Sequence, residues 1–147
     1  MLLAHKKRGE QSLGRSRGGL STKIHITVDG LGNPLRFCLS AGQRHDITQA
    51  ENLVTGFVFE RLIADRGYAA QDFVNWLQEQ GMEAVIPPHQ LAKKAREYDT
   101  WWYRERHLVE CFINKIKHFR RIFSRFEKLD CSYLGFLHFV GTLIWLR

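Results

Sequence analysis

A chain of 147 residues is long enough for one domain with a modest core, and a second full domain is not expected. Hydrophobic residues make up 44% of the chain, as in a globular protein. The net charge of +7 and the pI near 9.6 indicate a polyanionic partner, most often nucleic acid, although a basic ribosomal protein or a merely solvated basic surface has the same balance.

The cysteines and the apolar ends of the chain exclude several other classes of protein. Cys38, Cys111 and Cys131 are widely spaced and form no Cys-x2-Cys pair, so neither a zinc site nor a disulfide framework is indicated, and we expect them to be small buried residues. Residues 1–4 are too short for a signal peptide, and residues 134–146 are too short to span a bilayer. The sequence therefore predicts a soluble, cytoplasmic protein without a membrane partner.

The N-terminal segment is basic and rich in Gly and Ser over residues 5–19. We expect residues 1–20 to be flexible unless DNA orders them, although a solvated terminus without a partner has the same composition. Residues 21–147 are then the folded domain.

A β-hairpin is predicted over residues 22–40. Ile24, Ile26 and Val28 alternate with polar residues in the first strand, so one side of the strand is buried. Residues 29–34 supply the turn, and residues 35–40 form the returning strand. Asp29 is therefore expected to be a turn residue rather than a metal ligand.

The middle of the chain reads as alternating helices and short strands. A helix is predicted over residues 46–54, a strand ending at Asp65, a helix over residues 68–80 that Gly81 terminates, and a strand over residues 84–86. An Asp after a strand and before a Gly turn lies at the carboxyl end of that strand, where open α/β sheets bind their ligands. The fold class predicted from this order is α/β.

The last third of the chain is predicted to be helical. A polar loop over residues 89–98 precedes a long helix over residues 100–125 and a final helix over residues 133–147. We expect Trp101, Trp102 and Trp145 to pack these helices on the sheet, although Trp101 or Trp102 could instead stack on a base.

One face of the long helix carries a Tyr-x2-Arg-x3-Glu-x6-Lys pattern. Its residues Tyr103, Arg106, Glu110 and Lys117 fall within roughly 60° of each other around the helix axis. A separate apolar stripe consists of Phe112, Ile116, Phe119 and Phe123. An ordinary amphipathic helix with a solvated charged face has the same pattern, so the interpretation as a site depends on the spacing together with Asp65.

This spacing resembles the glutamate signature of bacterial insertion-sequence transposases of the DDE type. Further segments resemble other blocks of that family in the family's order, and together they cover nearly the whole chain: residues 14–25, 42–46 (Gly-Gln-Arg-His-Asp), 64–68 (Ala-Asp-Arg-Gly-Tyr), 85–88 and 119–122.

The resemblance implies an RNase H-like (retroviral-integrase-like) fold, a mixed sheet with flanking helices. It implies metal-dependent DNA cleavage and strand transfer, with transposon ends and target DNA as partners, in a homo-oligomer on the DNA. Asp65 and Glu110 match the family's second Asp and its Glu, which are catalytic residues and metal ligands. Tyr103, Arg106 and Lys117 are expected to contact phosphates or to position the Glu, and Arg120 and Arg121 are expected to bind DNA.

Two further residues, His45 and Asp46, match a family block whose role does not follow from the residues. We expect them to support the loop near the site rather than to bind a metal.

The expected cofactor is Mg²⁺ or Mn²⁺. Two such ions about 4 Å apart can activate the attacking oxygen and stabilise the leaving oxygen. Because these ions take oxygen ligands, the pair calls for roughly three carboxylates. Ala4 and His5 resemble a pair that follows the family's first catalytic Asp, which would place that Asp upstream of Met1. We therefore expect a two-metal site only with that Asp, and a sheet that lacks its first, central strand.

Three hypotheses of function remain open. In the first, the chain is the C-terminal part of a transposase, joined to the product of an upstream reading frame and inactive without it, and associated with the nucleoid. Alternatively, it is a non-catalytic DNA-binding relic or an inhibitor of the intact transposase. A third hypothesis, an unrelated basic RNA-binding domain, is weaker because the stacking motifs of such domains are absent.

Overall fold

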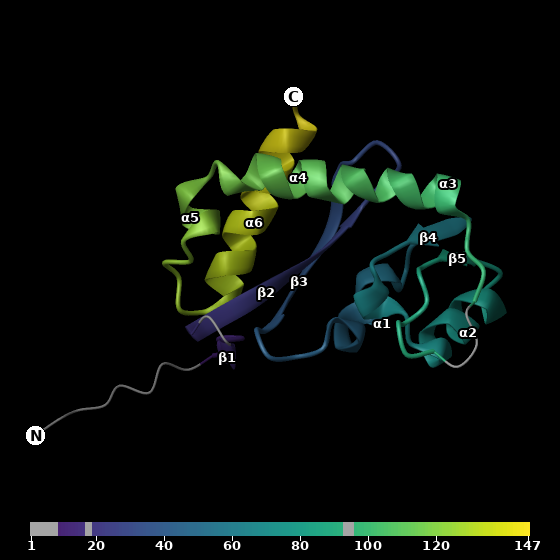
Figure 1. The fold of residues 1–147 in the computed structure, drawn as a ribbon. Helices are drawn as coiled ribbons and strands as arrows, with labels where there is room; N and C mark the ends of the chain where they lie inside the picture. The colour runs from purple at the N-terminus through teal and green to yellow at the C-terminus, as the bar shows by residue number, and fades with distance from the viewer. Residues whose placement is uncertain (1–8, 17–18, 93–95) are drawn as a thin grey trace, which may run out of the picture.

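The computed structural model describes residues 9–16, 19–92 and 96–147, which form two small sheets flanked by helices (Figure 1). The strands β1 (Gly14–Ser16), β2 (Gly19–Val28) and β3 (Pro34–Ala41) form an antiparallel sheet, and β4 (Arg61–Ile63) pairs in parallel with β5 (Glu83–Val85). The predicted mixed α/β class is confirmed.

Helices flank these sheets. The α-helices of five or more residues are α1 (Ala50–Val54), α2 (Gln71–Glu79), α4 (His107–Lys117) and α6 (Asp130–Trp145). The shorter helical segments are α3 (Thr100–Tyr103), α5 (Arg120–Phe123) and the 3-10 turns η1 (Asp46–Gln49), η2 (Arg66–Tyr68) and η3 (Arg104–Arg106).

The predicted hairpin is present as β2 and β3. Asp29 fixes its turn, because its Oδ1 atom accepts hydrogen bonds of 2.9 Å from the backbone N–H groups of Leu31 and Asn33. The prediction of Asp29 as a turn residue is therefore confirmed. One difference lies upstream: residues 14–16 and 19–20 are in strands, where the sequence analysis expects a flexible segment, and residues 1–8 and 17–18 lie outside the described residues.

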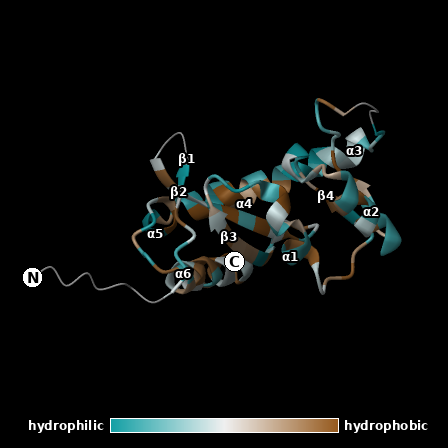
Figure 2. Ribbon diagram, turned by 90° about the horizontal axis from the view of Figure 1, so that it is seen from below, coloured by the Kyte–Doolittle hydropathy of each residue, from teal (hydrophilic) through white to brown (hydrophobic). Residues whose placement is uncertain are grey.

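Two hydrophobic cores lie on either side of the hairpin. The first joins the hairpin to α4, α5 and α6, and Figure 2 shows hydrophobic residues along these elements. Its buried members are Phe37, Phe112, Ile116, Ile122, Tyr133, Leu137 and Val140. The second core joins α1, α2 and the residues beside β5, and includes Leu53, Val74, Leu77 and Ile86. The hairpin is thereby covered on both faces. Leu62 of β4 also packs against the second core, so β4 and the turn after it lie on that face of the hairpin.

The predicted helix over residues 100–125 is interrupted. α3, η3 and α4 follow one another in a nearly straight line that passes from the β4–β5 sheet to the β2–β3 hairpin (Figure 1). The chain then turns at Phe119, whose backbone is extended, and α5 begins at the next residue. This turn buries Ile122 but leaves Phe123 71% exposed, so the predicted apolar stripe is wrong for Phe123.

Other predicted core residues are also exposed. Trp101 is 61% exposed, and Trp145 is 51% exposed although its ring N–H donates to the carbonyl oxygen of Pro34. Cys111 and Cys131 are exposed and only Cys38 is half-buried, so the expectation of buried cysteines is wrong for two of the three. Among the described helices, none is both long and apolar enough to cross a membrane.

Candidate active site

Asp65 lies just beyond the carboxyl end of β4, as its sequence context predicts. β4 runs parallel to β5, and the pairing continues to the bond from the Ala64 N–H to the carbonyl oxygen of Val85. Asp65 then starts the 3-10 turn η2, in which its carbonyl oxygen accepts a 2.9 Å bond from the N–H of Tyr68. A parallel strand end therefore presents this carboxylate at the edge of the sheet.

Arg106 joins Asp65 to Glu110. One guanidinium nitrogen lies 3.1 Å from Asp65 Oδ1 and the other lies 2.7 Å from Glu110 Oε1, one helical turn further on. Burial alone would lower the pKa of Arg106, but the charge of Asp65 and the hydrogen bond and charge of Glu110 raise it above its ordinary value. The structure thus brings the two predicted catalytic carboxylates to either side of one cation.

Tyr103 belongs to the same group of residues. The Arg106 guanidinium lies 5.8 Å from the centre of its ring, and the ring of Tyr98 packs edge-on against it at 5.5 Å. Burial and the charge of Asp65 raise the pKa of Tyr103, so its hydroxyl stays protonated and can donate a hydrogen bond.

The turn that carries Asp65 is held against the hairpin by polar contacts. Buried His25 on β2 lies with Nδ1 2.9 Å from the Tyr68 hydroxyl and with Nε2 2.8 Å from the Ser40 hydroxyl. Burial lowers the pKa of His25, against the charge of Asp46, which raises it. Burial, together with the charges of Asp46 and Asp65, raises the pKa of Tyr68. The neutral ring and the phenol therefore stay paired at neutral pH.

Asp46 supports the same turn. Its Oδ1 atom lies 2.8 Å from the Lys23 ammonium, and a Cβ atom added at Gly67 would lie 2.8 Å from its Oδ2 atom. The expectation that Asp46 supports a loop near the site agrees with this contact. His45 is exposed, and its carbonyl oxygen accepts hydrogen bonds from Thr48.

Sequence patterns did not identify His25 and Tyr68 as part of this site. His25 falls on the polar side of the predicted strand, because the alternation assigns only one face to the core. That second face is covered by the turn after β4, a contact between distant segments that periodicity does not report. Arg106 is expected to contact phosphates or to position the Glu, and in the structure it forms an ion pair with Glu110, four residues further on, a spacing typical of ion pairs within a helix.

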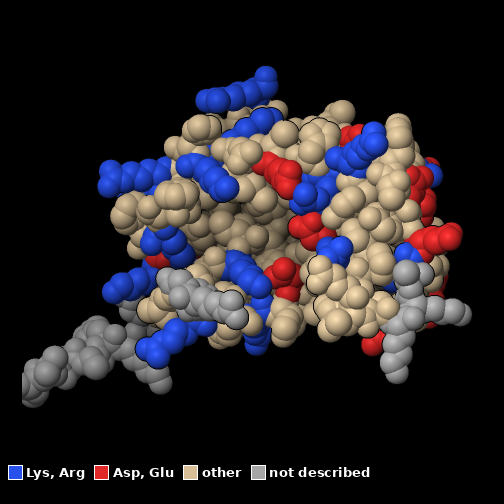
Figure 3. All heavy atoms as spheres, viewed as in Figure 1, with Lys and Arg blue, Asp and Glu red and all other residues tan. Residues whose placement is uncertain are grey.

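The remaining predicted DNA-contacting residues lie away from the two carboxylates, at the end of α4 and in α5. Arg120 lies 5.8 Å from the ring centre of Phe126, and Arg121 lies 3.3 Å from Glu127 Oε1. In Figure 3, Lys and Arg gather on the left, the side of α5, whereas Asp and Glu gather toward the centre and right. Lys117, Arg120 and Arg121 thus belong to a cationic end of the molecule.

A half-open groove of about 600 Å³ lies between β2, α4 and the loop after α5. Figure 3 shows the surface hollowed below α4. The wall along β2 and α4 is apolar and includes Ile24, Ile26, Ile113 and Ile116, and the wall at the α5 loop carries aromatic and charged side chains.

The carboxylates of this site fit a divalent cation only in part. Their oxygens are the ligands that Mg²⁺ and Mn²⁺ take, and more than half of each side chain, 58% for Asp65 and 54% for Glu110, is exposed to solvent. Across the described ranges, however, no three residues of the types His, Cys, Asp and Glu are placed to hold a metal together. The ranges 1–8, 17–18 and 93–95 contain no Asp or Glu in the sequence.

Comparisons with known proteins agree with the resemblance of the motifs. The family model of the transposase DDE domain matches residues 3–133. A protein of Brucella ovis, named as a transposase for insertion sequence element IS6501, is 35% identical over 130 residues, which are 87% of this chain and 100% of that protein. A protein of Burkholderia cepacia, named as a transposase for insertion sequence element IS402, is 31% identical over 150 residues, which are 94% of this chain and 68% of that protein. No solved structure matches.

Proposed function

Because this chain belongs to the family of insertion-sequence transposases with a DDE domain, we propose that it contributes Asp65 and Glu110 to the metal-dependent cleavage and strand transfer of DNA ends. The observation that carries the proposal is the bridge of Arg106 to both carboxylates. Residues from a strand end and from a separate helix meet there, at an exposed edge that DNA can reach.

Mg²⁺ or Mn²⁺ would be held by Asp65 and Glu110 together with a third carboxylate from a further polypeptide segment. When bound, such ions activate the attacking water or hydroxyl and stabilise the leaving oxygen. Two carboxylates alone compensate the charge of a metal pair poorly. We therefore propose that the 147 residues by themselves do not cleave DNA.

Arg106 has two roles in this proposal. Without a metal it neutralises the two carboxylates, which would otherwise repel each other. If Asp65 and Glu110 held a divalent cation, the Arg106 guanidinium would lose these two partners and would be free to bind a phosphate oxygen of the DNA, beside the hydroxyl of Tyr103.

We further propose that the complete site has an RNase H-like arrangement, in which another strand lies between β2 and β4. Two features support it. Within the described residues, β2 pairs with β1 only over residues 19–21, so the rest of that edge has no strand beside it. The apolar wall of the groove, with Ile24, Ile26, Ile113 and Ile116, lies along this edge. A strand there would join the two sheets and bring the third carboxylate.

The proposed substrates are the transposon ends and target DNA, bound largely through phosphates. Lys117, Arg120 and Arg121 supply cations at one end of the molecule, and phosphate contacts of this kind position DNA without reading its sequence. The working assembly is proposed to be a homo-oligomer on the DNA.

A cleavage assay on a labelled transposon end, with Mg²⁺ or Mn²⁺, tests the function. The 147-residue chain should bind the DNA without cutting it, and the chain joined to a segment with the third carboxylate should cleave. That cleavage should disappear with Asp65→Ala or Glu110→Ala. DNA binding without cleavage by the joined protein would support the alternative, a non-catalytic relic or an inhibitor. Efficient cleavage by the chain alone would show that the third carboxylate is misassigned, and Asp29 and Asp46 would be tested next.

A further inference from the structure

Two exposed aromatic rings lie beside the cations of α5. Phe123 is 71% exposed and Phe126 is 58% exposed, and both line the groove at its α5 wall. Rings of this size are normally buried, and here each costs free energy by remaining in water. The Arg120 guanidinium lies 5.8 Å from the ring centre of Phe126, so a cation and an aromatic ring are neighbours on this part of the surface.

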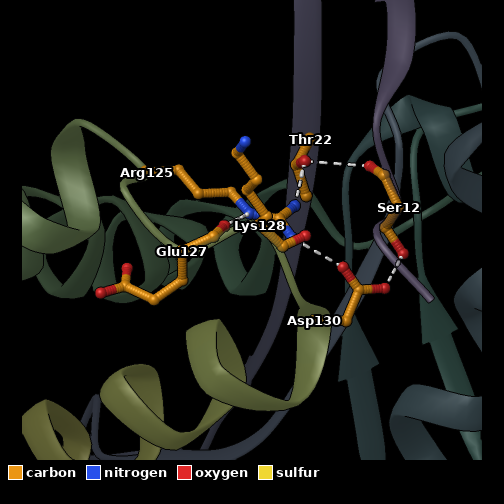
Figure 4. Close-up of polar contacts among 6 residues, drawn as sticks. All are labelled: Ser12, Thr22, Arg125, Glu127, Lys128 and Asp130. Carbon is orange, nitrogen blue, oxygen red and sulfur yellow. Dashed lines mark hydrogen bonds and ion pairs between the residues drawn. The ribbon is translucent and has the colours of Figure 1, made fainter. Parts of the chain in front are cut away.

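Arg125 holds this segment in a fixed conformation (Figure 4). Its side chain is 11% exposed and donates to the carbonyl oxygens of Glu127 and Lys128 at 2.9 Å and 3.2 Å, to Asp130 Oδ1 at 2.8 Å, and to the hydroxyl of Thr22. Asp130 also accepts a hydrogen bond from Ser12. The loop around Phe126 is thereby tied to β2, to α6 and to the segment before β1.

The other end of the segment is tied as well. The hydroxyl of Tyr133, on α6, donates a 2.7 Å bond to the carbonyl oxygen of buried Ile122, directly before Phe123. Both rings therefore protrude from backbone that is fixed on either side, and little conformational entropy remains to be lost when they bind a partner.

The charge around the rings favours a polyanion. Lys117 and Lys128 line the groove, and Glu127 is the acidic member of that lining among the described residues; Arg125 also lines it but is already paired with Asp130. Glu127 lies 3.3 Å from Arg121, which offsets its charge. Figure 3 shows that this side of the molecule is rich in Lys and Arg. A protein partner with an apolar surface would cover the rings but make no contact that uses the cations. Nucleic acid uses both, because its bases stack on the rings and its phosphates bind the cations.

We propose that Phe123 and Phe126 form a stacking site for unpaired bases of single-stranded DNA, with the neighbouring phosphates bound by Lys117, Arg120 and Lys128. Every base has a flat face that stacks on an aromatic ring, so the site is tolerant of sequence. Bases in a duplex are already stacked on one another, so the site favours frayed or single-stranded ends over intact duplex. This inference rests on the proposed function, in which DNA ends are opened during cleavage and joining.

The test measures affinity of the 147-residue chain for a labelled single strand of about 12 nucleotides and for a duplex. Phe123→Leu and Phe126→Leu keep an apolar side chain but remove the ring, and each should weaken single-strand binding roughly tenfold with little change for duplex. Phe123→Trp should retain the wild-type affinity. Phe139→Leu is the matched control, since Phe139 on α6 is also 61% exposed, and it should change neither affinity. Quenching of 2-aminopurine in the strand reports stacking directly.

Several outcomes would overturn the proposal. Equal losses for Phe139→Leu, or unchanged single-strand affinity in both Phe variants while duplex still binds, would contradict the stacking site but leave the proposed function intact. Absence of binding to either DNA would contradict both. A change in self-association, measured by sedimentation, without a change in DNA affinity would identify the rings as a protein contact instead.

Discussion

Arg106 and Asp65 are joined by an ion pair of 3.1 Å that connects the α3–α4 line of helices to the end of β4. The same guanidinium bonds to Glu110 at 2.7 Å. A group from one helix therefore sets the position of two carboxylates that belong to different elements, and the candidate site depends on this contact.

Arg106→Gln should lower the free energy of unfolding by only about 0.5–1 kcal/mol, because the carboxylates are more than half exposed and water screens them. Urea denaturation measures the change. In the double variant with Glu110→Gln, part of the loss should be recovered, since one of the two unneutralised carboxylates is then removed. A loss above about 3 kcal/mol in the free energy of unfolding would mean that the contacts of Arg106 with the two carboxylates mainly stabilise the fold, and that Arg106 does not leave them to bind DNA.

The Arg125–Asp130 pair should matter far more for stability. Both side chains are almost buried, at 11% and 12% exposure, so Asp130→Ala leaves a buried cation without its carboxylate. We expect a loss of about 3 kcal/mol in the free energy of unfolding. Asp72→Ala on α2, where the carboxylate is exposed, is the control and should cost less than about 1 kcal/mol. Equal effects of the two substitutions would contradict the contacts in Figure 4.

His25 should make stability dependent on pH. Burial lowers its pKa in the folded chain below the ordinary value of 6.5, so the unfolded chain binds the proton more readily. The stability due to neutral His25 is thus present above pH 6.5 and is lost as the pH falls through the lowered folded pKa. Urea midpoints measured from neutral to mildly acidic pH should show this fall, and His25→Gln should flatten it. His118→Gln, at an exposed position, should leave the fall unchanged.

DNA binding should weaken steeply with salt. Arg120→Gln and Arg121→Gln should each lower the slope of log affinity against log salt by about 1, since each removes one phosphate contact. Arg147→Gln, at the other end of α6, is the control and should leave the slope unchanged. A salt-independent affinity for duplex DNA would contradict binding through phosphates.

Local patterns predicted the parts of the fold that depend on neighbouring residues. The hairpin, the turn at Asp29 and the position of Asp65 after β4 follow from alternation and turn residues within short windows. The break at Phe119 and the exposure of Phe123 could not be predicted, because they depend on how α5 turns toward α6. The contacts of His25 with Tyr68, of Arg125 with Thr22, and of Asp130 with Ser12 join segments far apart in the chain and leave no periodic signal.

The most direct test of the account is where a divalent cation binds to the chain. Mn²⁺ added to isotope-labelled protein broadens NMR resonances near its binding site. We predict selective broadening around residues 65–68 and 107–110, lost with Asp65→Asn or with Glu110→Gln and retained in Glu105→Gln, a neighbouring carboxylate on the same line of helices. Broadening centred on Asp46 or Asp29, or broadening that survives both substitutions, would contradict the assignment of Asp65 and Glu110 as the metal-binding pair.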